Sequence, residues 1–92
     1  MFYVYILASG RNGTLYIGVT NNVAKRLDLH RRGAGSEFVK RYNINRLVYV
    51  ETYARAEEAI QREKQMKKWN RAWKINLIER DNADWRNLSN DL

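Results

Sequence analysis

The segment LYIGVTNNVAKRLDLH, residues 15–30, places a tyrosine, an arginine and the only histidine of the chain at spacings of ten and four. Arg26 and His30 project from one face of a helix, because residues four apart lie one above the other. A guanidinium binds phosphate through paired hydrogen bonds, and an imidazole exchanges protons near neutral pH. A lone histidine is more often a satisfied or surface residue, but beside Arg26 on a face that packs against a sheet it indicates a functional site.

Glu63 is the second residue whose position is unusual. The segment 56–66 carries an apolar stripe at helical spacing, formed by Ala56, Ala59, Ile60 and Met66. Glu63 lies in the middle of this stripe, so a carboxylate interrupts the buried face. Such a carboxylate suits a buried base or an oxygen ligand for a hard cation. The alternative is an edge residue paired with Lys67, and Glu51 is then a second candidate ligand.

A hairpin must position the tyrosines that precede this helix. Residues 2–8 and 14–20 are rich in β-branched and aromatic residues, and SGRNG between them supplies positive-φ positions for a turn. Alternation along the two strands gathers the aliphatic residues on one face, namely Phe2, Val4, Ile6, Ala8, Leu15, Ile17 and Val19. The tyrosines therefore lie on the opposite face.

The register of this hairpin decides which side chains meet. Pairing Ser9 with Asn12 brings both apolar sets to one side and sets Tyr5 across from Tyr16. Two phenols then stand side by side next to Gly18, whose missing side chain lets a helix or a ligand approach the sheet closely. An ordinary cross-strand aromatic pair is the alternative.

The remaining elements follow from caps, composition and stop signals. Asn22 caps a helix from Val23 to about Arg32 that stops at Gly33. The other expected elements are a loop over 32–45 with room for one helical turn, a strand over 46–53, a long helix over 55–69 and a helix from Arg71 to about Glu79 capped by Asn70.

Length, net charge and cysteine content limit the class of protein to which the chain can belong. Its 92 residues suffice for one domain, expected over residues 1–80, with a polar tail over 81–92 that frays unless Trp85 docks on the core. Seventeen Lys and Arg against ten Asp and Glu give a net charge of +7, typical of a polyanion-binding protein. The absence of cysteine excludes disulfides and makes the cytoplasm the default compartment. FYVYILA is too short to span a membrane.

Five positions in order resemble the GIY-YIG nuclease domain: YVY at residues 3–5, YIG at residues 16–18, Arg26, His30 and Glu63. The similarity runs from Phe2 to about Glu79 and is greatest to small stand-alone bacterial proteins. It implies an α+β fold in which a small three-stranded antiparallel sheet is flanked by helices. It also implies divalent-metal-dependent hydrolysis of nucleic-acid phosphodiesters, with the site at Tyr5, Tyr16, Arg26, His30 and Glu63.

The chain departs from the family pattern in three places. Tyr3 and Val4 stand where the first motif word has glycine and isoleucine, and Val19 stands where some members have lysine. The late asparagine of several nucleases has two candidates, Asn70 and Asn76.

Each residue type has a chemical role in such a site. Arg26 is assigned to phosphate stabilisation and Tyr5 to water activation, with Arg26 lowering the pKa of the phenol. Tyr16 and His30 are assigned to substrate positioning or proton transfer, and the identity of the general base stays open. A single carboxylate, Glu63, favours one Mg²⁺ or Mn²⁺ that keeps several waters over a pair of ions.

Basic residues outside this group are candidates for contacts to nucleic acid. They are Arg31, Arg32, Lys40, Arg41, Lys64, Lys67, Lys68, Arg71 and Lys74. Trp69 and Trp73 lie among them, and their spacing of four favours core packing over base stacking.

Two functions from different classes are compatible with these residues. The first is a nuclease acting on nucleic acid, with DNA favoured and either structured or single-stranded. The second is a non-catalytic nucleic-acid-binding module on the same fold. A nuclease that takes its specificity from a protein partner is a third, and the domain is expected to be a monomer or a weak dimer.

Overall fold

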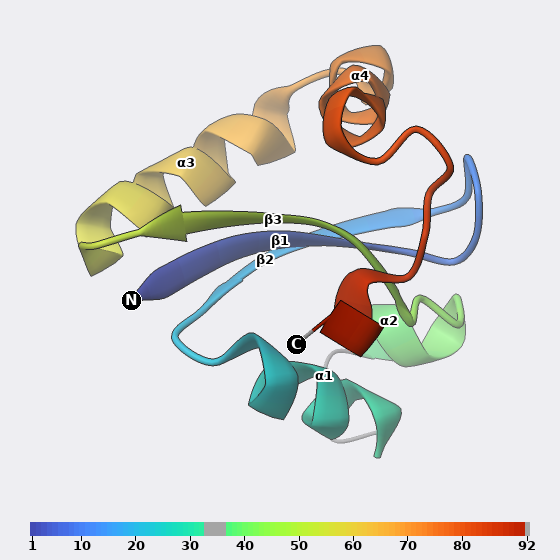
Figure 1. The fold of residues 1–92 in the computed structure, drawn as a ribbon, viewed down its shortest axis with the longest axis horizontal. Helices are drawn as coiled ribbons and strands as arrows, with labels where there is room; N and C mark the ends of the chain where they lie inside the picture. The colour runs from blue at the N-terminus through green and yellow to red at the C-terminus, as the bar shows by residue number, and fades with distance from the viewer. Residues whose placement is uncertain (33–36, 92) are drawn as a thin grey trace.

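A three-stranded antiparallel sheet forms the centre of the molecule in the computed structural model, which describes residues 1–32 and 37–91 (Figure 1). The strands are β1 (Phe2–Ala8), β2 (Leu15–Thr20) and β3 (Arg46–Tyr53), in the spatial order β2-β1-β3. The expected α+β architecture is confirmed, and the predicted strand bounds hold except that β2 begins one residue later.

Four helices and a final 3₁₀ turn complete the described part of the chain. They are α1 (Val23–Arg31), α2 (Glu37–Arg41), α3 (Ala56–Lys68), α4 (Arg71–Asp81) and η1 (Leu88–Asp91). Both predicted asparagine caps are present: Asn22 accepts a hydrogen bond from Lys25 N at 3.0 Å, and Asn70 accepts one from Trp73 N at 2.9 Å. The expected stop at Gly33 lies outside the described residues.

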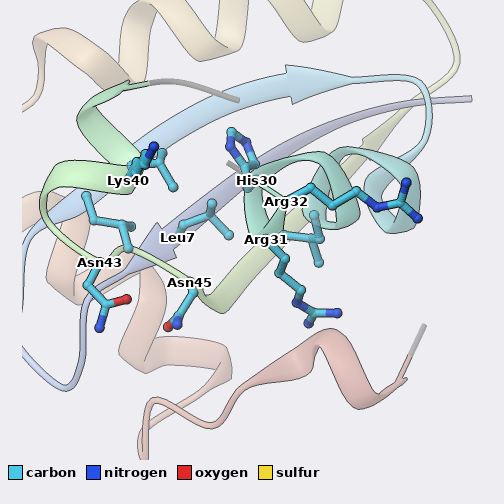
Figure 2. A pocket seen from close by; sticks show the side chains of 10 residues that line it. Leu7, His30, Arg31, Arg32, Lys40, Asn43 and Asn45 are labelled. Atoms are coloured by element: carbon cyan, nitrogen blue, oxygen red, sulfur yellow. The ribbon is translucent and has the colours of Figure 1, made fainter. Parts of the chain in front are cut away.

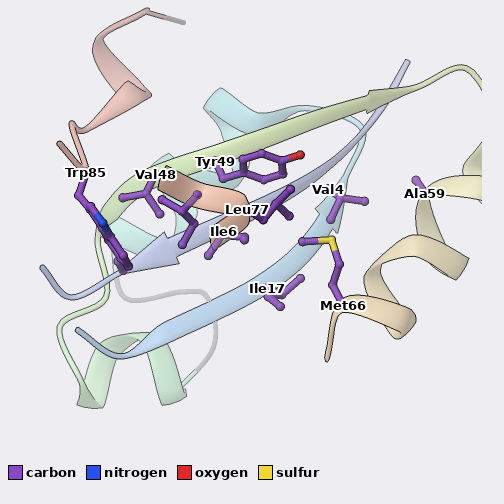
Figure 3. Packing of buried hydrophobic residues seen from close by; sticks show 11 residues of the cluster. Val4, Ile6, Ile17, Val48, Tyr49, Ala59, Met66, Leu77 and Trp85 are labelled. Carbon is purple, nitrogen blue, oxygen red and sulfur yellow. The ribbon is translucent and has the colours of Figure 1, made fainter. Parts of the chain in front are cut away.

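The helices form two layers, with α3 and α4 on one face of the sheet and α1 and α2 on the other (Figure 1). Alternation along the strands separates two cores accordingly. The first contains the predicted aliphatic set with Met66 of α3 and Ile78 of α4 (Figure 3). The second contains Tyr5, with Val23 and Leu27 of α1 packed on the same face. The tyrosine face is therefore the face that α1 covers.

The predicted hairpin register is wrong by two residues. Ser9 N donates to Thr14 O at 3.0 Å, so the loop spans residues 10–13 and Tyr5 lies opposite Gly18 instead of Tyr16. The longer loop is stabilised by Arg71, whose guanidinium donates to the carbonyls of Asn12 and Gly13, both at 2.6 Å. Because the observed register differs from the predicted one by an even number of residues, every side chain keeps its expected face of the sheet.

Residues 82–91 pass along the edge of the sheet at β3, so of the two alternatives, fraying or docking of Trp85 on the core, docking is the one observed. Trp85 is fully buried in the first core, while Leu88 packs against the second. Asn82 directs this path, because its buried amide donates to Val48 O at 3.2 Å and to Arg86 O at 3.0 Å. Asn87 then accepts a hydrogen bond from Leu47 N at 3.3 Å, which satisfies an edge-strand donor.

Replacing Trp85 by Ala is expected to lower the free energy of unfolding by about 3–5 kcal/mol, because it empties a buried indole site. The substitution also removes the hydrogen bond from the indole Nε1 to Glu79 Oε2, 2.8 Å long. Trp73, which is 58% exposed, provides the matched control. Trp73→Ala should cost only about 0.5–1.5 kcal/mol, the value of its edge-to-face contact with Trp69. Urea denaturation of both variants measures the difference, and equal losses would contradict it.

Candidate active site

Tyr5 and Gly18 form the floor of the candidate site. The Tyr5 ring lies across the strand pair over Gly18, where an added Cβ would come within 2.5 Å of the ring Cζ and closer still to the hydroxyl. The absent side chain therefore makes room for the phenol itself, whereas the sequence predicted a helix or a ligand there. The Tyr16 ring is tilted beside it, with ring centroids 6.4 Å apart.

Helix α1 brings His30 and Arg26 to these tyrosines, with Val23 and Leu27 of the same helix buried against the sheet. The Nε2 of His30 lies 3.5 Å from the Tyr5 hydroxyl, and the imidazole meets the Tyr16 ring edge-to-face at 5.8 Å. Within the described residues, the buried Nδ1 of His30 has no hydrogen-bond partner. The imidazole therefore has one ring nitrogen directed at a phenol and a second, buried one that is unsatisfied among the described residues.

The pKa of the Tyr5 phenol is raised, whereas the sequence predicted that Arg26 lowers it. Burial is the main cause that raises the pKa of Tyr5 to about 12, and Tyr16 and Glu63 add to it. Arg26 lowers the pKa of this phenol through its charge and as a hydrogen-bond donor, but it does not compensate. The expectation that Arg26 brings the Tyr5 pKa below its ordinary value is therefore wrong for the protein alone.

His30 has the opposite shift. Burial and then the positive charge of Arg26 lower the pKa of His30 from its ordinary value. The imidazole is therefore neutral at pH 7 and able to accept a proton. Tyr5 keeps its proton at the same pH, so the pair combines a proton donor with an acceptor.

Glu63 is partly buried on α3, with a side chain only 14% exposed. Its Oε1 lies 3.2 Å from the Lys67 ammonium, so the pairing with Lys67 that was the alternative is present. The charge of Glu63 is also the smallest of the causes that shift the pKa of Tyr5. The described residues contain no group of three His, Cys, Asp or Glu side chains that could hold a metal ion. One carboxylate fits an ion such as Mg²⁺ that keeps most of its water ligands.

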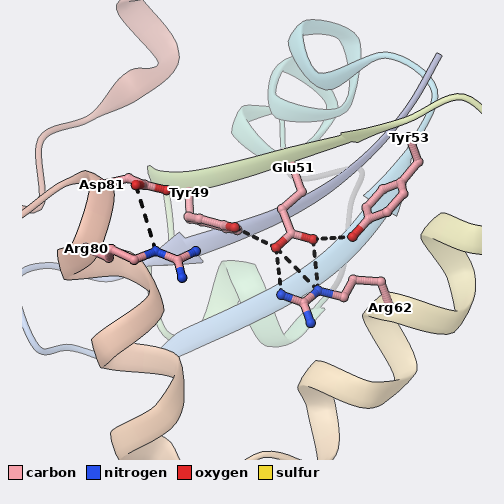
Figure 4. A network of polar contacts seen from close by, with 6 residues as sticks. All are labelled: Tyr49, Glu51, Tyr53, Arg62, Arg80 and Asp81. Atoms are coloured by element: carbon pink, nitrogen blue, oxygen red, sulfur yellow. Dashed lines mark hydrogen bonds and ion pairs between the residues drawn. The ribbon is translucent and has the colours of Figure 1, made fainter.

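Glu51, the second candidate ligand, is fully engaged elsewhere (Figure 4). Arg62 holds it through two nitrogens, with Nε 3.0 Å from Oε1 and Nη2 2.9 Å from Oε2. The hydroxyls of Tyr49 and Tyr53 donate to the same carboxylate at 2.5 Å and 2.7 Å. Burial alone would raise the pKa of Glu51, but the hydrogen bonds from Arg62, Tyr49 and Tyr53 outweigh it and lower the pKa. This carboxylate joins β3 to α3.

The Glu51 network predicts a pH-dependent loss of stability. Because its pKa is lowered on folding, Glu51 stabilises the protein above its ordinary pKa of 4.5, and this contribution is lost as the pH falls through the folded-state pKa. Glu51→Gln leaves Arg62 without its charge partner and should cost about 2 kcal/mol at pH 7. Urea denaturation at pH 7 and pH 3 should show the gap between wild type and variant shrinking in acid. A gap that stays constant would contradict this assignment.

Comparison with known proteins gives the family. The family model described as "GIY-YIG catalytic domain" matches residues 1–76, and this range contains all five candidate residues. The chain belongs to the GIY-YIG family. This family is one of nuclease catalytic domains, as the resemblance of YVY and YIG had implied.

Relatives of this GIY-YIG domain are small proteins of similar length. A UPF0213 protein of Clostridium perfringens is 35% identical over 92 residues, which cover 100% of this chain and 98% of that protein. One from Bacillus licheniformis is 38% identical over 87 residues, 91% of this chain and 89% of that protein. The solution NMR structure of a UPF0213 protein from Bacillus halodurans matches with a TM-score of 0.58 and 31% identity, over 95% of this chain and 93% of that one.

The basic residues of the GIY-YIG domain fall into two groups on helices that cover opposite faces of the sheet. Arg31, Arg32, Lys40 and Arg41 lie on or beside α1 and α2, and Lys64, Lys67, Lys68, Arg71 and Lys74 lie on α3 and α4. Members of both groups are already engaged within the fold: Lys67 pairs with Glu63 and Arg71 with the hairpin loop, while Arg31 donates to Ser89 and Arg32 pairs with Asp28. The group on α1 and α2 shares its face with His30 and Tyr5.

Trp69 and Trp73 do not both enter the core. Trp69 is half-buried and packs against the first core, with the Arg62 guanidinium 4.9 Å above its ring centroid. Trp73 meets Trp69 edge-to-face at 6.0 Å but is exposed, and Ile60 is exposed as well. Core packing of Trp73 and burial of Ile60 are therefore wrong, because the first turn of α4 and the outer side of α3 face solvent.

A cavity of about 400 Å³ adjoins the site between α1 and α2 (Figure 2). His30, Arg31, Lys40, Asn43 and Asn45 are among its lining residues. The two asparagines, which follow α2 in the stretch YNIN, were not among the site residues predicted from the sequence. The available signal was the pattern of a helix end, since Asn43 adopts the left-handed conformation with φ 55° that asparagine tolerates there. Separately, no helix among the described residues is long and apolar enough to cross a bilayer.

Proposed function

We propose that this protein is a divalent-metal-dependent endonuclease that hydrolyses phosphodiester bonds of nucleic acid, with DNA the favoured substrate, structured or single-stranded. One observation carries the proposal: the Tyr5 hydroxyl lies 3.5 Å from Nε2 of His30, and the Arg26 guanidinium acts on the same phenol. A cytoplasmic monomer or weak dimer, with a protein partner as a source of specificity, completes the proposal.

Arg26 provides the positive charge that a phosphodiester requires. Its guanidinium is exposed one helical turn from His30 and can form two parallel hydrogen bonds to the phosphoryl oxygens. These oxygens gain negative charge as the water attacks, so a cation already in place favours the transition state over the ground state.

Tyr5 and His30 together support proton transfer from the attacking water. The phenol accepts the water proton while its own proton moves to Nε2 of His30, the water oxygen bonds to phosphorus, and the bond to the leaving oxygen breaks. The high pKa of Tyr5 and the lowered pKa of His30 suit this relay, because neither group must ionise beforehand. Solvent returns a proton to the leaving oxygen, and Tyr16 packs against both rings and orients them.

Glu63 would hold the metal ion by a carboxylate oxygen. A bound Mg²⁺ or Mn²⁺ supplies charge stabilisation at the phosphoryl and leaving oxygens and lowers the pKa of its water. Lys67 neutralises the carboxylate of Glu63 in the protein alone, so metal binding requires the Lys67 ammonium to move aside. Lys67 is exposed and flexible enough to do so.

Cleavage of end-labelled single-stranded, duplex and branched DNA, with matched RNA, tests the proposal. Each substrate is incubated with Mg²⁺, with Mn²⁺ and with EDTA. Metal-dependent products from at least one substrate are expected, and they identify the substrate class. Binding of all substrates without products in either metal would instead support the alternative, a non-catalytic nucleic-acid-binding module.

A further inference from the structure

The cavity between α1 and α2 has the size of a small-molecule site. Its volume of about 400 Å³ lies within the range of roughly 300–1,000 Å³ typical of ligand pockets. A group of the size of one nucleoside fits this space, whereas a helix or a duplex does not. His30 lines the cavity and also faces the Tyr5 hydroxyl, so the cavity opens directly beside the catalytic group.

The walls of the cavity combine three kinds of side chain. The floor is aliphatic, formed by Leu7, Leu27, Val39 and Ile44. Asn43 and Asn45 stand on one side of Leu7, with Arg31 on the other (Figure 2). The amide groups of Asn43 and Asn45 offer both donors and acceptors to the edge of a planar ring. Arg31 and Lys40 add positive charge at the rim, which favours an attached phosphate.

We propose that this cavity accepts the base of an unpaired nucleotide next to the phosphate that is cleaved. The inference rests on the proposed nuclease function and defines its substrate as a single strand, or a strand locally unpaired. Arg26 lies one turn before His30 on α1, so a phosphate on Arg26 places the neighbouring base within reach of the cavity. A base held in a duplex cannot enter without leaving its stack.

Asn43 also has a role in the fold, and the test must separate the two. Its backbone closes α2 in the left-handed conformation, where Ile44 N donates to Val39 O at 3.0 Å. Glycine adopts that conformation without strain, so Asn43→Gly keeps the turn and removes only the amide. Combining it with Asn45→Ala strips both amides from the cavity.

Fluorescence anisotropy in EDTA measures binding without cleavage. The probes are a labelled single-stranded DNA decamer and a labelled decamer of abasic units with the same phosphates. Wild type should bind the base-bearing decamer about tenfold more tightly than the abasic one. The double variant Asn43→Gly with Asn45→Ala should lose this preference and bind the abasic decamer as wild type does. Trp73→Ala, which removes an exposed ring from the other face of the sheet, should keep the preference.

Three results would overturn the proposal. Equal binding of both decamers by wild type would show that only the phosphates are recognised. Absence of binding to either decamer would show that single-stranded DNA is not a ligand. Loss of the preference in Trp73→Ala but not in the double variant would assign the base to α4. The nuclease function is tested separately, by cleavage in the presence of metal ions. Cleavage without a preference for the base-bearing decamer would contradict only the base-binding cavity. A preference for that decamer without cleavage would contradict only the nuclease function.

Discussion

Replacing Glu63 by Gln is expected to lower the rate of phosphodiester cleavage at least about a thousandfold while nucleic-acid binding in EDTA stays within about twofold. The variant keeps the shape of the side chain and loses its charge, so the proposed metal site loses its carboxylate ligand. Raising the Mg²⁺ concentration should restore part of the rate, because a weakened site fills at higher metal concentration.

Two neighbouring variants serve as controls for Glu63→Gln. Glu58→Gln removes an exposed carboxylate from the same helix and should leave the rate unchanged. Lys67→Met removes the partner of Glu63 and should lower the metal concentration needed for half-maximal rate, because the carboxylate no longer has a competing cation. If Glu63→Gln cleaved at the wild-type rate, Glu63 would be only the edge residue paired with Lys67.

Tyr5→Phe is the second change with a large expected effect, a loss of about 10²–10⁴-fold in the cleavage rate. The phenyl ring fills the same space over Gly18, so packing is retained and only the proton-transferring hydroxyl is lost. Single-turnover kinetics with enzyme in excess isolate the chemical step. The Kd for substrate in EDTA should stay within about twofold of wild type.

Tyr3→Phe is the matched control, since Tyr3 lies on the same face of β1 and packs against the second core. Its cleavage rate should equal that of wild type. Tyr16→Phe should have a smaller effect than Tyr5→Phe, because the edge-to-face contact of its ring with His30 is retained. A larger loss in Tyr16→Phe than in Tyr5→Phe would transfer the proton relay from Tyr5 to Tyr16.

The architecture was predictable because local signals agreed with the tertiary structure. Enrichment in β-branched and aromatic residues assigned Phe2–Ala8 and Arg46–Tyr53 to strands at their observed bounds, and Asn22 and Asn70 marked helix starts that the structure retains. The hairpin register was not predictable in the same way. It depends on Arg71, distant in sequence, which holds the carbonyls of the four-residue loop.

The grouping of candidate residues followed from periodicity, whereas their electrostatics did not. Spacing of four placed Arg26 and His30 on one helix face, and alternation placed Tyr5 on the strand face that this helix covers. The raised pKa of Tyr5 follows from burial, which depends on packing across the whole molecule. The engagement of Glu51 and the cavity lined by Asn43 arise from contacts between distant elements and carry no periodic signal.

The most direct test of the proposed active site is single-turnover cleavage by wild type, Arg26→Lys and Arg26→Ala in Mg²⁺, with whichever labelled substrate wild type cuts. Wild type should cut only with metal present, Arg26→Lys should retain a small fraction of the rate because it keeps charge without the paired hydrogen bonds, and Arg26→Ala should be inactive. Cleavage by Arg26→Ala at the wild-type rate, or none by wild type in either metal, would contradict a hydrolytic centre built around Tyr5, Arg26 and His30.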